Sequence, residues 1–257
     1  MKKRALFIIF GFLLNSEAFA IVSLESLHFG DNAPGFKASI AAGANGVARV
    51  NGGTNVTDRI RGEGTGTLQW NREASIYYLS ASAGYGKSGG IVDQNEAFIH
   101  GRRIANITSK TAWEVFSQME QDEFARLKLR AIGGGGLRFL LGEKNPQQAL
   151  FVGTGLFYSH ELIDDDEDTI EKAVKGNLYL LFKRKLTENA AFVNTVYMQP
   201  NVTSVNEFRI LERATLKVSI TNRIAIKLDI EVKHNNTPPL DVNKTDIKYT
   251  TGFEYNF

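Results

Sequence analysis

Apolar and polar residues alternate with a period of two along most of this chain. Residues 224–233 read IAIKLDIEVK, with isoleucine, leucine or valine at every even position and alanine or a charged residue at every odd one. Residues 246–257 repeat the pattern and place Tyr249, Phe253, Tyr255 and Phe257 on one face. Because successive side chains of a β-strand point to opposite sides of the sheet, this alternation predicts strands with one apolar and one polar face.

Twelve such segments follow one another, separated by clusters of Gly, Asn, Asp or Pro. They are predicted at residues 35–45, 57–72, 74–86, 95–107, 111–123, 126–141, 148–162, 175–186, 190–200, 206–219, 222–234 and 246–257. A soluble β-sandwich also alternates in this way. Strands of soluble proteins average about five or six residues, however, whereas a tilted strand needs about nine to eleven to cross a bilayer. Segment length therefore favours a membrane barrel.

The connections between these segments alternate in length. Short turns are predicted at 70–74, 107–111, 142–147, 186–190 and 219–222, and mostly longer loops at 46–56, 87–96, 163–174 and 235–245. Short periplasmic turns and longer outer loops are typical of bacterial outer-membrane barrels. The sequence therefore predicts an all-β fold, an antiparallel transmembrane β-barrel of about 12 strands over residues 35–257, with both of its ends on the periplasmic side.

The first twenty residues have the features of an export signal. Lys2, Lys3 and Arg4 form a basic segment, residues 5–14 are apolar, and residues 18–20 read Ala-Phe-Ala, a small-x-small cleavage site. The apolar stretch is too short for a membrane helix, which needs about twenty residues. We predict a signal peptide at 1–20 cleaved after Ala20, a periplasmic lead-in at 21–34, and location in the outer membrane.

Composition removes several classes of function. The chain has no cysteine, which excludes disulfides, thiolate metal sites, a cysteine nucleophile and a lipidated N-terminal cysteine. Its net charge is +2, and removing the predicted signal takes away three basic residues and one acidic residue. The remainder is then electrically neutral, so binding of nucleic acid has no electrostatic support. No apolar run reaches the length of a membrane helix.

The C-terminal strand carries an aromatic pattern. Tyr249, Phe253, Tyr255 and Phe257 share a face, and Phe257 ends the chain. Aromatic residues are favoured in strands generally, but this arrangement resembles the C-terminal β-signal of outer-membrane proteins. The resemblance implies that these four residues act as an assembly signal. It also implies partners: the barrel-assembly machinery during biogenesis, then outer-membrane lipid and lipopolysaccharide.

The middle of the chain resembles a known family. Residues 113–124 read WEVFSQMEQDEF, and they are followed by Leu127, Arg130 and the run GGGGLR at 133–138. This hairpin is similar to that of the putative salt-induced outer membrane protein family, which is YdiY-like and a domain of unknown function. Residues 51–55 read NGGTN and depart from the Ser-Gly-Asn-Thr turn usual in that family. The resemblance implies an outer-membrane barrel and a response to salt or osmotic stress.

If the apolar faces contact lipid, the charged faces line the lumen. The predicted lumen charges are Glu114, Glu120, Lys128, Arg130, Arg138, Lys227, Asp229 and Glu231. Their signs are mixed, so we expect ion pairs between neighbouring strands, with Glu114 and Glu120 facing Lys128 and Arg130. Twelve strands lie between the filled eight-stranded and the open sixteen-stranded barrels, and a narrow or plugged lumen is favoured over an open, charge-lined pore.

Signals of catalysis or metal binding are weak. Ser159, His160 and Glu161 have the residue types of a catalytic triad, but adjacent residues of a strand point to opposite faces. The acidic run at 164–168 lacks the glycine turn of a calcium loop and is interpreted as a solvated outer loop. The glycines at 133–136 are not followed by a phosphate-binding Lys-Ser/Thr pair and indicate close backbone approach or sharp curvature.

We therefore predict a barrel that is not an enzyme and has no metal and no cofactor. Its expected function is a narrow pore or a structural barrel in the response to envelope or osmotic stress. One alternative is a surface barrel that binds a ligand with its outer loops. The other is an outer-membrane lipid hydrolase.

Overall fold

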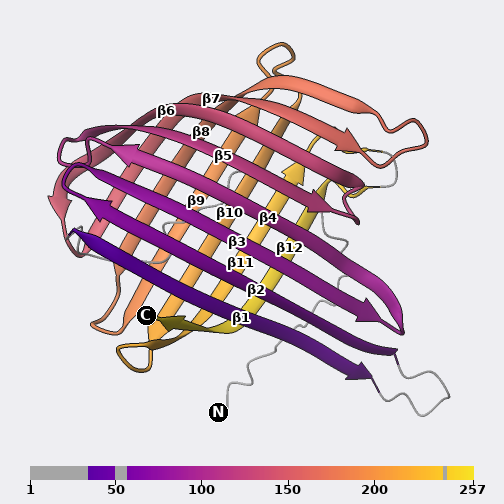
Figure 1. Ribbon diagram of the computed structural model, residues 1–257, viewed down its shortest axis with the longest axis horizontal. Coiled ribbons are helices and arrows are strands. Elements are labelled where there is room, and N and C mark those ends of the chain that lie inside the picture. Colours follow the sequence, from indigo (N-terminus) through magenta and orange to yellow (C-terminus); the bar gives the residue numbers. More distant parts are fainter. Residues whose placement is uncertain (1–33, 50–56, 240–241) are drawn as a thin grey trace, which may run out of the picture.

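The computed structural model describes residues 34–49, 57–239 and 242–257. Within these residues, twelve antiparallel strands form one closed barrel in which each strand pairs with its neighbours in chain order (Figure 1). The predicted fold class is confirmed. The predicted signal peptide and the lead-in as far as residue 33 lie outside the described residues. No helix in the described part of the chain is long and apolar enough to cross a membrane.

The strands range from 11 to 19 residues in length. They are β1 Gly35–Arg49, β2 Thr57–Arg72, β3 Ser75–Ser88, β4 Ile91–Ala105, β5 Thr111–Asp122, β6 Leu127–Asn145, β7 Gln148–Ile163, β8 Ile170–Lys185, β9 Ala190–Pro200, β10 Phe208–Ser219, β11 Ile224–Asn235 and β12 Thr245–Asn256. All twelve overlap the predicted segments, and several extend further at the end that carries the predicted longer loops.

One of the predicted longer loops is absent. Residues 87–96 were expected to connect two strands, but β3 and β4 continue through them and meet at a two-residue turn. That turn consists of Gly89 and Gly90, whose φ angles are 57° and 84°. Two consecutive positive φ angles are the requirement of the tight hairpin turn that matches strand twist, and glycine adopts them without steric cost.

The barrel closes where the last strand pairs with the first. β12 lies antiparallel to β1, with the register running from Ser39↔Asn256 to Gly43↔Gly252. The start of β1 and the end of β12 therefore share one end of the barrel (Figure 1). The connections β2–β3, β4–β5, β6–β7, β8–β9 and β10–β11 also lie at that end, here called the turn end. The opposite end is called the loop end.

The outer surface is apolar and the interior is polar. Large hydrophobic side chains such as Ile40, Leu79 and Leu156 are exposed along the outside. The residues between them, such as Thr67, Ser80 and many charged groups, are buried inside. This distribution of apolar and polar side chains is the reverse of that in a soluble protein. It suits a barrel whose outer surface contacts lipid, as the alternation predicted.

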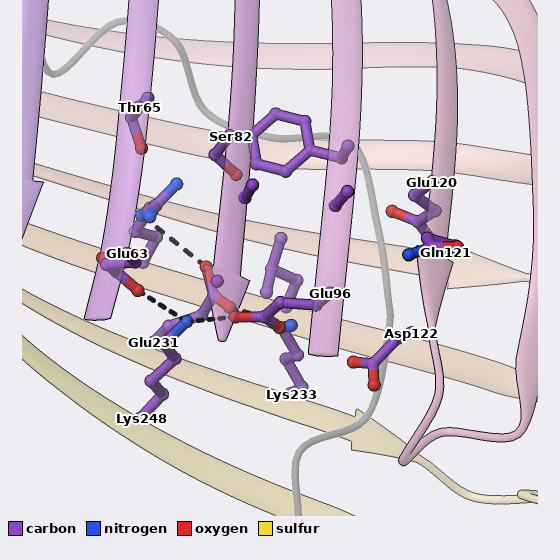
Figure 2. A pocket seen from close by; sticks show the side chains of 16 residues that line it. Glu63, Thr65, Ser82, Glu96, Glu120, Gln121, Asp122, Glu231, Lys233 and Lys248 are labelled. Atoms are coloured by element: carbon purple, nitrogen blue, oxygen red, sulfur yellow. Dashed lines mark hydrogen bonds and ion pairs between the residues drawn. The ribbon is translucent and has the colours of Figure 1, made fainter. Parts of the chain in front are cut away.

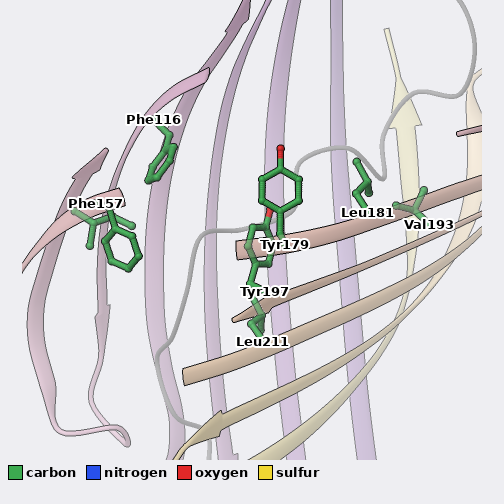
Figure 3. Close-up of a cluster of buried hydrophobic side chains, with 8 residues drawn as sticks. Phe116, Phe157, Tyr179, Leu181, Val193, Tyr197 and Leu211 are labelled. Carbon is green, nitrogen blue, oxygen red and sulfur yellow. The ribbon is translucent and has the colours of Figure 1, made fainter. Parts of the chain in front are cut away.

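A cluster of apolar side chains fills part of the interior. It consists of Phe116, Ile132, Phe157, Tyr179, Leu181, Val193, Tyr197 and Leu211, contributed by strands β5 to β10 (Figure 3). The rings of Tyr179 and Tyr197 lie side by side on neighbouring strands, with centroids 5.3 Å apart. The alternation of the sequence did not predict this apolar packing inside the barrel.

Glycines on β6 and β7 make room for this cluster. A Cβ atom on Gly153 would overlap the ring of its cross-strand partner Tyr179. On Gly134 it would overlap Phe157, and on Gly136 it would overlap the backbone of Thr154. The interpretation of the Gly-rich run as a place of close approach is therefore confirmed.

We expect Gly153→Ala to destabilise the barrel by about 1–3 kcal/mol, because the added methyl group forces the buried Tyr179 ring to move. The free energy of unfolding can be measured by urea titration in detergent micelles, followed by fluorescence of Trp70 and Trp113. Gly66→Ala is the matched control, since a Cβ at Gly66 would have nothing within 4 Å. Equal stability of the two variants would contradict the proposed role of Gly153.

Candidate functional site in the barrel lumen

Side chains from opposite walls meet across the lumen. Arg102 on β4 donates a hydrogen bond from Nη2 to the hydroxyl of Tyr197 on β9, 3.4 Å away. The Tyr179 hydroxyl on β8 donates to Glu114 Oε2 on β5 at 3.1 Å. Arg102 Nη1 and Glu114 Oε2 are 3.9 Å apart and connect the two contacts. These four side chains form a continuous group that we call the crossing layer.

The crossing layer is buried, and its Arg102 and Glu114 lie toward the turn end. Arg102 comes shortly before the end of β4, and Glu114 shortly after the start of β5. All four residues are less than 6% exposed. The guanidinium of Arg102 also lies over the ring of Phe116, 5.9 Å from its centroid. A buried charge is tolerated only when it is paired, so Arg102 and Glu114 hold each other in place.

A cluster of ion pairs lies on the loop side of the crossing layer. Lys248 Nζ on β12 lies 2.7 Å from Glu63 Oε2 and 2.5 Å from Glu96 Oε1 (Figure 2). Lys233 Nζ lies 3.0 Å from Glu231 Oε1, and Arg213 Nε lies 3.6 Å from Glu231 Oε2. The remaining space between these residues is about 60 Å³. That volume suits a few water molecules rather than an organic solute.

A second cluster surrounds Glu161 near the loop end of β7. Its carboxylate accepts from Lys175 Nζ at 2.9 Å, from Arg130 Nη2 at 3.2 Å, and from both terminal nitrogens of Arg209 at 2.8 and 2.9 Å. Ser159 Oγ donates to it at 2.6 Å. Glu161 is 2% exposed, so one buried carboxylate holds three cations from three other strands.

Seven of the eight predicted lumen charges lie inside the barrel. Glu114 belongs to the crossing layer, and Glu120 forms an ion pair with Arg130, its cross-strand partner. The Arg138 guanidinium lies 3.7 Å from the ring centroid of Phe151. On β11 the contacts are those of Lys227 with Asp229 at 3.4 Å, of Asp229 with the hydroxyl of Thr215, and of Glu231 with Lys233 and Arg213.

Lys128 differs from the prediction. The register between β6 and β7 shifts between Leu127 and Leu129, and this bulge places Lys128 at the exposed rim. Its ammonium group pairs with Asp168 and, at 2.9 Å, with Asp164, both in the connection to β8. The expected pairing of Lys128 with Glu114 or Glu120 is therefore wrong, because the bulge interrupts the alternation on which it rested.

The acidic run after β7 organises its own loop. Thr169 N donates to Asp165 Oδ1 at 2.8 Å, and Glu167 N donates to the same oxygen at 3.3 Å. Hydrogen bonds from Thr169 lower the pKa of Asp165 from its ordinary value. In the described residues no group of three or more His, Cys, Asp or Glu side chains is arranged to hold a metal ion.

The interior histidine is not paired with a serine nucleophile. His100 on β4 is fully buried and lies directly across from Ser80 on β3. Its Nδ1, however, is 3.0 Å from Gln118 Oε1, and its Nε2 has no hydrogen-bond partner in the described structure. Ser159 and Glu161 share the interior face, as their spacing predicts, whereas His160 between them is partly exposed.

Several residues that build the lumen were not predicted from the sequence. Arg102, Tyr179, Tyr197 and Glu161 were not among the lumen candidates. Arg102 and Tyr179 follow the same alternation as their neighbours, so the sequence was sufficient to assign both residues to the interior face. The sequence does not contain the pairing across the lumen, because that depends on the strand tilt of the closed barrel.

The predicted assembly signal lies on the outer surface. Tyr249, Phe253 and Phe257 are 56%, 63% and 72% exposed, and Tyr255 is 37% exposed. The rings of Tyr255 and Phe257 meet edge to face with centroids 4.9 Å apart. Glu254, between them in the chain, is buried inside the barrel and pairs with Lys217.

Comparison with known proteins supports the fold. A family model described as "Protein of unknown function, DUF481" matches residues 46–257. An outer membrane channel from Pseudomonas putida F1 superposes with a TM-score of 0.57 at 9% identity, covering 91% of this chain and 100% of that chain. The NanC porin superposes with a TM-score of 0.53 at 7% identity, covering 84% and 98%. No protein of curated function matches the chain.

Replacing Glu161 with glutamine is expected to destabilise the barrel by about 3–5 kcal/mol, because three cations then lose their shared buried carboxylate. The measurement is the free energy of unfolding in detergent micelles. Glu188→Gln removes the same charge from an exposed turn between β8 and β9 and should leave stability unchanged. A loss below about 1 kcal/mol for Glu161→Gln would mean that the cluster is solvated like a surface pair.

Proposed function

Since the chain belongs to the DUF481 family of proteins of unknown function, as the resemblance of its central hairpin predicted, we propose that it is a narrow outer-membrane channel for small solutes. Its lumen is constricted by the crossing layer of Arg102, Glu114, Tyr179 and Tyr197. The protein is not an enzyme in this proposal. It takes solutes from the loop end toward the turn end without changing them.

The hydrogen bond between Arg102 and Tyr197 is the observation that carries the proposal. It joins β4 to β9 on opposite walls, so it stands in the path of any solute. The bond is long for its type, and it connects two side chains rather than a folded plug. A change of rotamer at Arg102 or Tyr197 would break this single contact and leave every strand pairing of the barrel in place.

The solved structures of similar fold support a channel over an enzyme. Two of them are described as an outer membrane channel and as a porin, and both cover most of this chain. The described lumen also lacks a serine bonded to a histidine, which the lipid hydrolase alternative would need. A structural barrel without conduction is the competing outcome. A role in salt or osmotic stress rests on the family resemblance alone and stays a prediction.

We further propose that the C-terminal aromatic face is read by the barrel-assembly machinery and afterwards contacts outer-membrane lipid and lipopolysaccharide. Tyr249, Phe253, Tyr255 and Phe257 support this because they are exposed on the outside of the final strand. Exposure of an aromatic face to water is unfavourable, and its transfer into a lipid or protein environment lowers the free energy.

Tyr197→Ala and Arg102→Ser, alone and together, are expected to widen the constriction. In planar bilayers the natural protein should give small or rare conductance steps, and the double variant larger and more frequent ones, by at least threefold. Tyr85→Ala is the control, because Tyr85 lies on the exposed outer surface. If the folded double variant stays as silent as the natural protein, the barrel is structural and the channel proposal is wrong.

Phe257→Ala is expected to slow assembly and reduce the amount of folded barrel in outer membranes. Heat-modifiable migration on gels distinguishes folded from unfolded protein. Phe36→Ala removes another exposed aromatic ring, at the start of β1, and should leave assembly unchanged. A normal amount of folded Phe257→Ala protein would contradict the assembly signal.

A further inference from the structure

A cavity of about 240 Å³ lies at the loop end, above the Glu161 cluster. Its wall is formed by strands β7 to β11 and by the connections that follow β9 and β11. Glu161, Lys175, Gln199, Arg209 and Asn235 contribute polar side chains, and Phe208 contributes an aromatic ring. Cavities that enclose drug-sized ligands start at about 300 Å³, so this one suits a smaller molecule.

Positive groups exceed the carboxylate that they share in this wall. Lys175 and Arg209 both bind Glu161, and Arg130 binds both Glu161 and Glu120. Within the described residues the Lys175 ammonium has Glu161 as its hydrogen-bond partner, although it carries three protons. The buried part of the cavity wall therefore carries two cations against one carboxylate, and Lys175 has protons that Glu161 does not accept.

Two amide groups add unused donors on either side of Arg209. Gln199 and Asn235 are its direct partners on the neighbouring strands β9 and β11, so the three side chains lie in one row. Both amides are buried, at 3% and 2% exposure. Gln199 Nε2 and Asn235 Nδ2 have no hydrogen-bond partner among the described residues. Asn235 Oδ1 accepts from Thr237 N at 3.2 Å, which identifies Nδ2 as the unused side of that amide.

An unpaired buried donor is unfavourable unless a ligand or a water molecule satisfies it. Here the row Gln199–Arg209–Asn235 places such donors beside a guanidinium on the wall of the cavity. A carboxylate supplies several acceptor lone pairs and one negative charge, and it meets planar donors with two oxygens at once. Phe208 offers a face to the carbon skeleton that carries it.

We propose that this cavity is a binding site for the carboxylate of a small organic acid about the size of a monosaccharide. This proposal rests on the proposed channel function and adds to it the class of solute that enters the cavity at the loop end. Binding at the site does not require conduction, so the two proposals can fail separately.

Two further charged groups lie on the cavity wall. Glu171 and Glu207 are negative, but both are exposed at the rim. The Glu207 carboxylate accepts from Asn201 Nδ2 at 2.9 Å and is thereby directed to the loop that follows β9. These two carboxylates weaken the attraction of the cavity for any anion, and they weaken it more for a dianion than for a monoanion.

The test is a titration of the folded full-length barrel in detergent micelles with D-glucuronate, followed by isothermal calorimetry. D-glucose is the neutral probe of the same size. We expect saturable binding of glucuronate and at least tenfold weaker binding of glucose. Equal affinities, or no binding of either sugar, would overturn the proposal. If inorganic phosphate binds and glucuronate does not, the carboxylate assignment is wrong.

Asn235→Asp tests the site itself. The variant replaces the unused donor with a negative acceptor of the same shape, so glucuronate affinity should fall at least tenfold. Asn189→Asp makes the same change in the exposed turn between β8 and β9 and should bind like the natural protein. Glu171→Gln removes one negative charge at the rim and should raise the affinity for glucuronate about twofold. Because Glu171 is exposed, the substitution should leave the fold intact. Unchanged affinity in both Asn235→Asp and Glu171→Gln would place the bound sugar elsewhere.

Conductance separates this inference from the proposed function. If glucuronate binds to a barrel that does not conduct, the binding site is supported and the channel proposal is wrong. If the barrel conducts but does not bind glucuronate, the channel is supported and the binding-site proposal is wrong.

Discussion

A strand inside a bilayer has no water to satisfy its backbone N–H and C=O groups, so a spanning sheet must close on itself. The pairing of β12 with β1 provides that closure. Once the sheet is closed, one face of every strand meets lipid and the other meets the lumen. The polar half of the alternating pattern must then lie inside, and every charge it carries has to be satisfied there.

Many of the charges inside the barrel are shared within groups of several residues. Lys248 is shared by Glu63 and Glu96, and Glu161 by Arg130, Lys175 and Arg209. Such sharing stabilises buried charges and also fixes the lumen's shape, because each group ties several strands together. In the proposed channel, stability and solute passage therefore depend on the same side chains, and a substitution that alters one also affects the other.

The alternation in the sequence was sufficient to predict the barrel, its twelve strands and the face to which most residues point. It was not sufficient where the period of two is interrupted, as at the bulge that exposes Lys128. Nor could it predict which residues meet across the lumen. Arg102 and Tyr197 are far apart in the chain, and their contact depends on the tilt and stagger of strands that only closure determines.

The buried polar groups at the two ends of the lumen have different surroundings. Toward the turn end, Arg102 and Glu114 contact each other and the hydroxyls of Tyr179 and Tyr197, and aromatic rings fill the space around them, while Arg102 Nε has no hydrogen-bond partner among the described residues. Near the loop end, the Glu161 cluster is satisfied while the neighbouring amide donors are not. In the proposed channel, the loop end offers solute a cavity beside the unused donors of Gln199 and Asn235, whereas the crossing layer holds solute back because its buried side chains close the lumen.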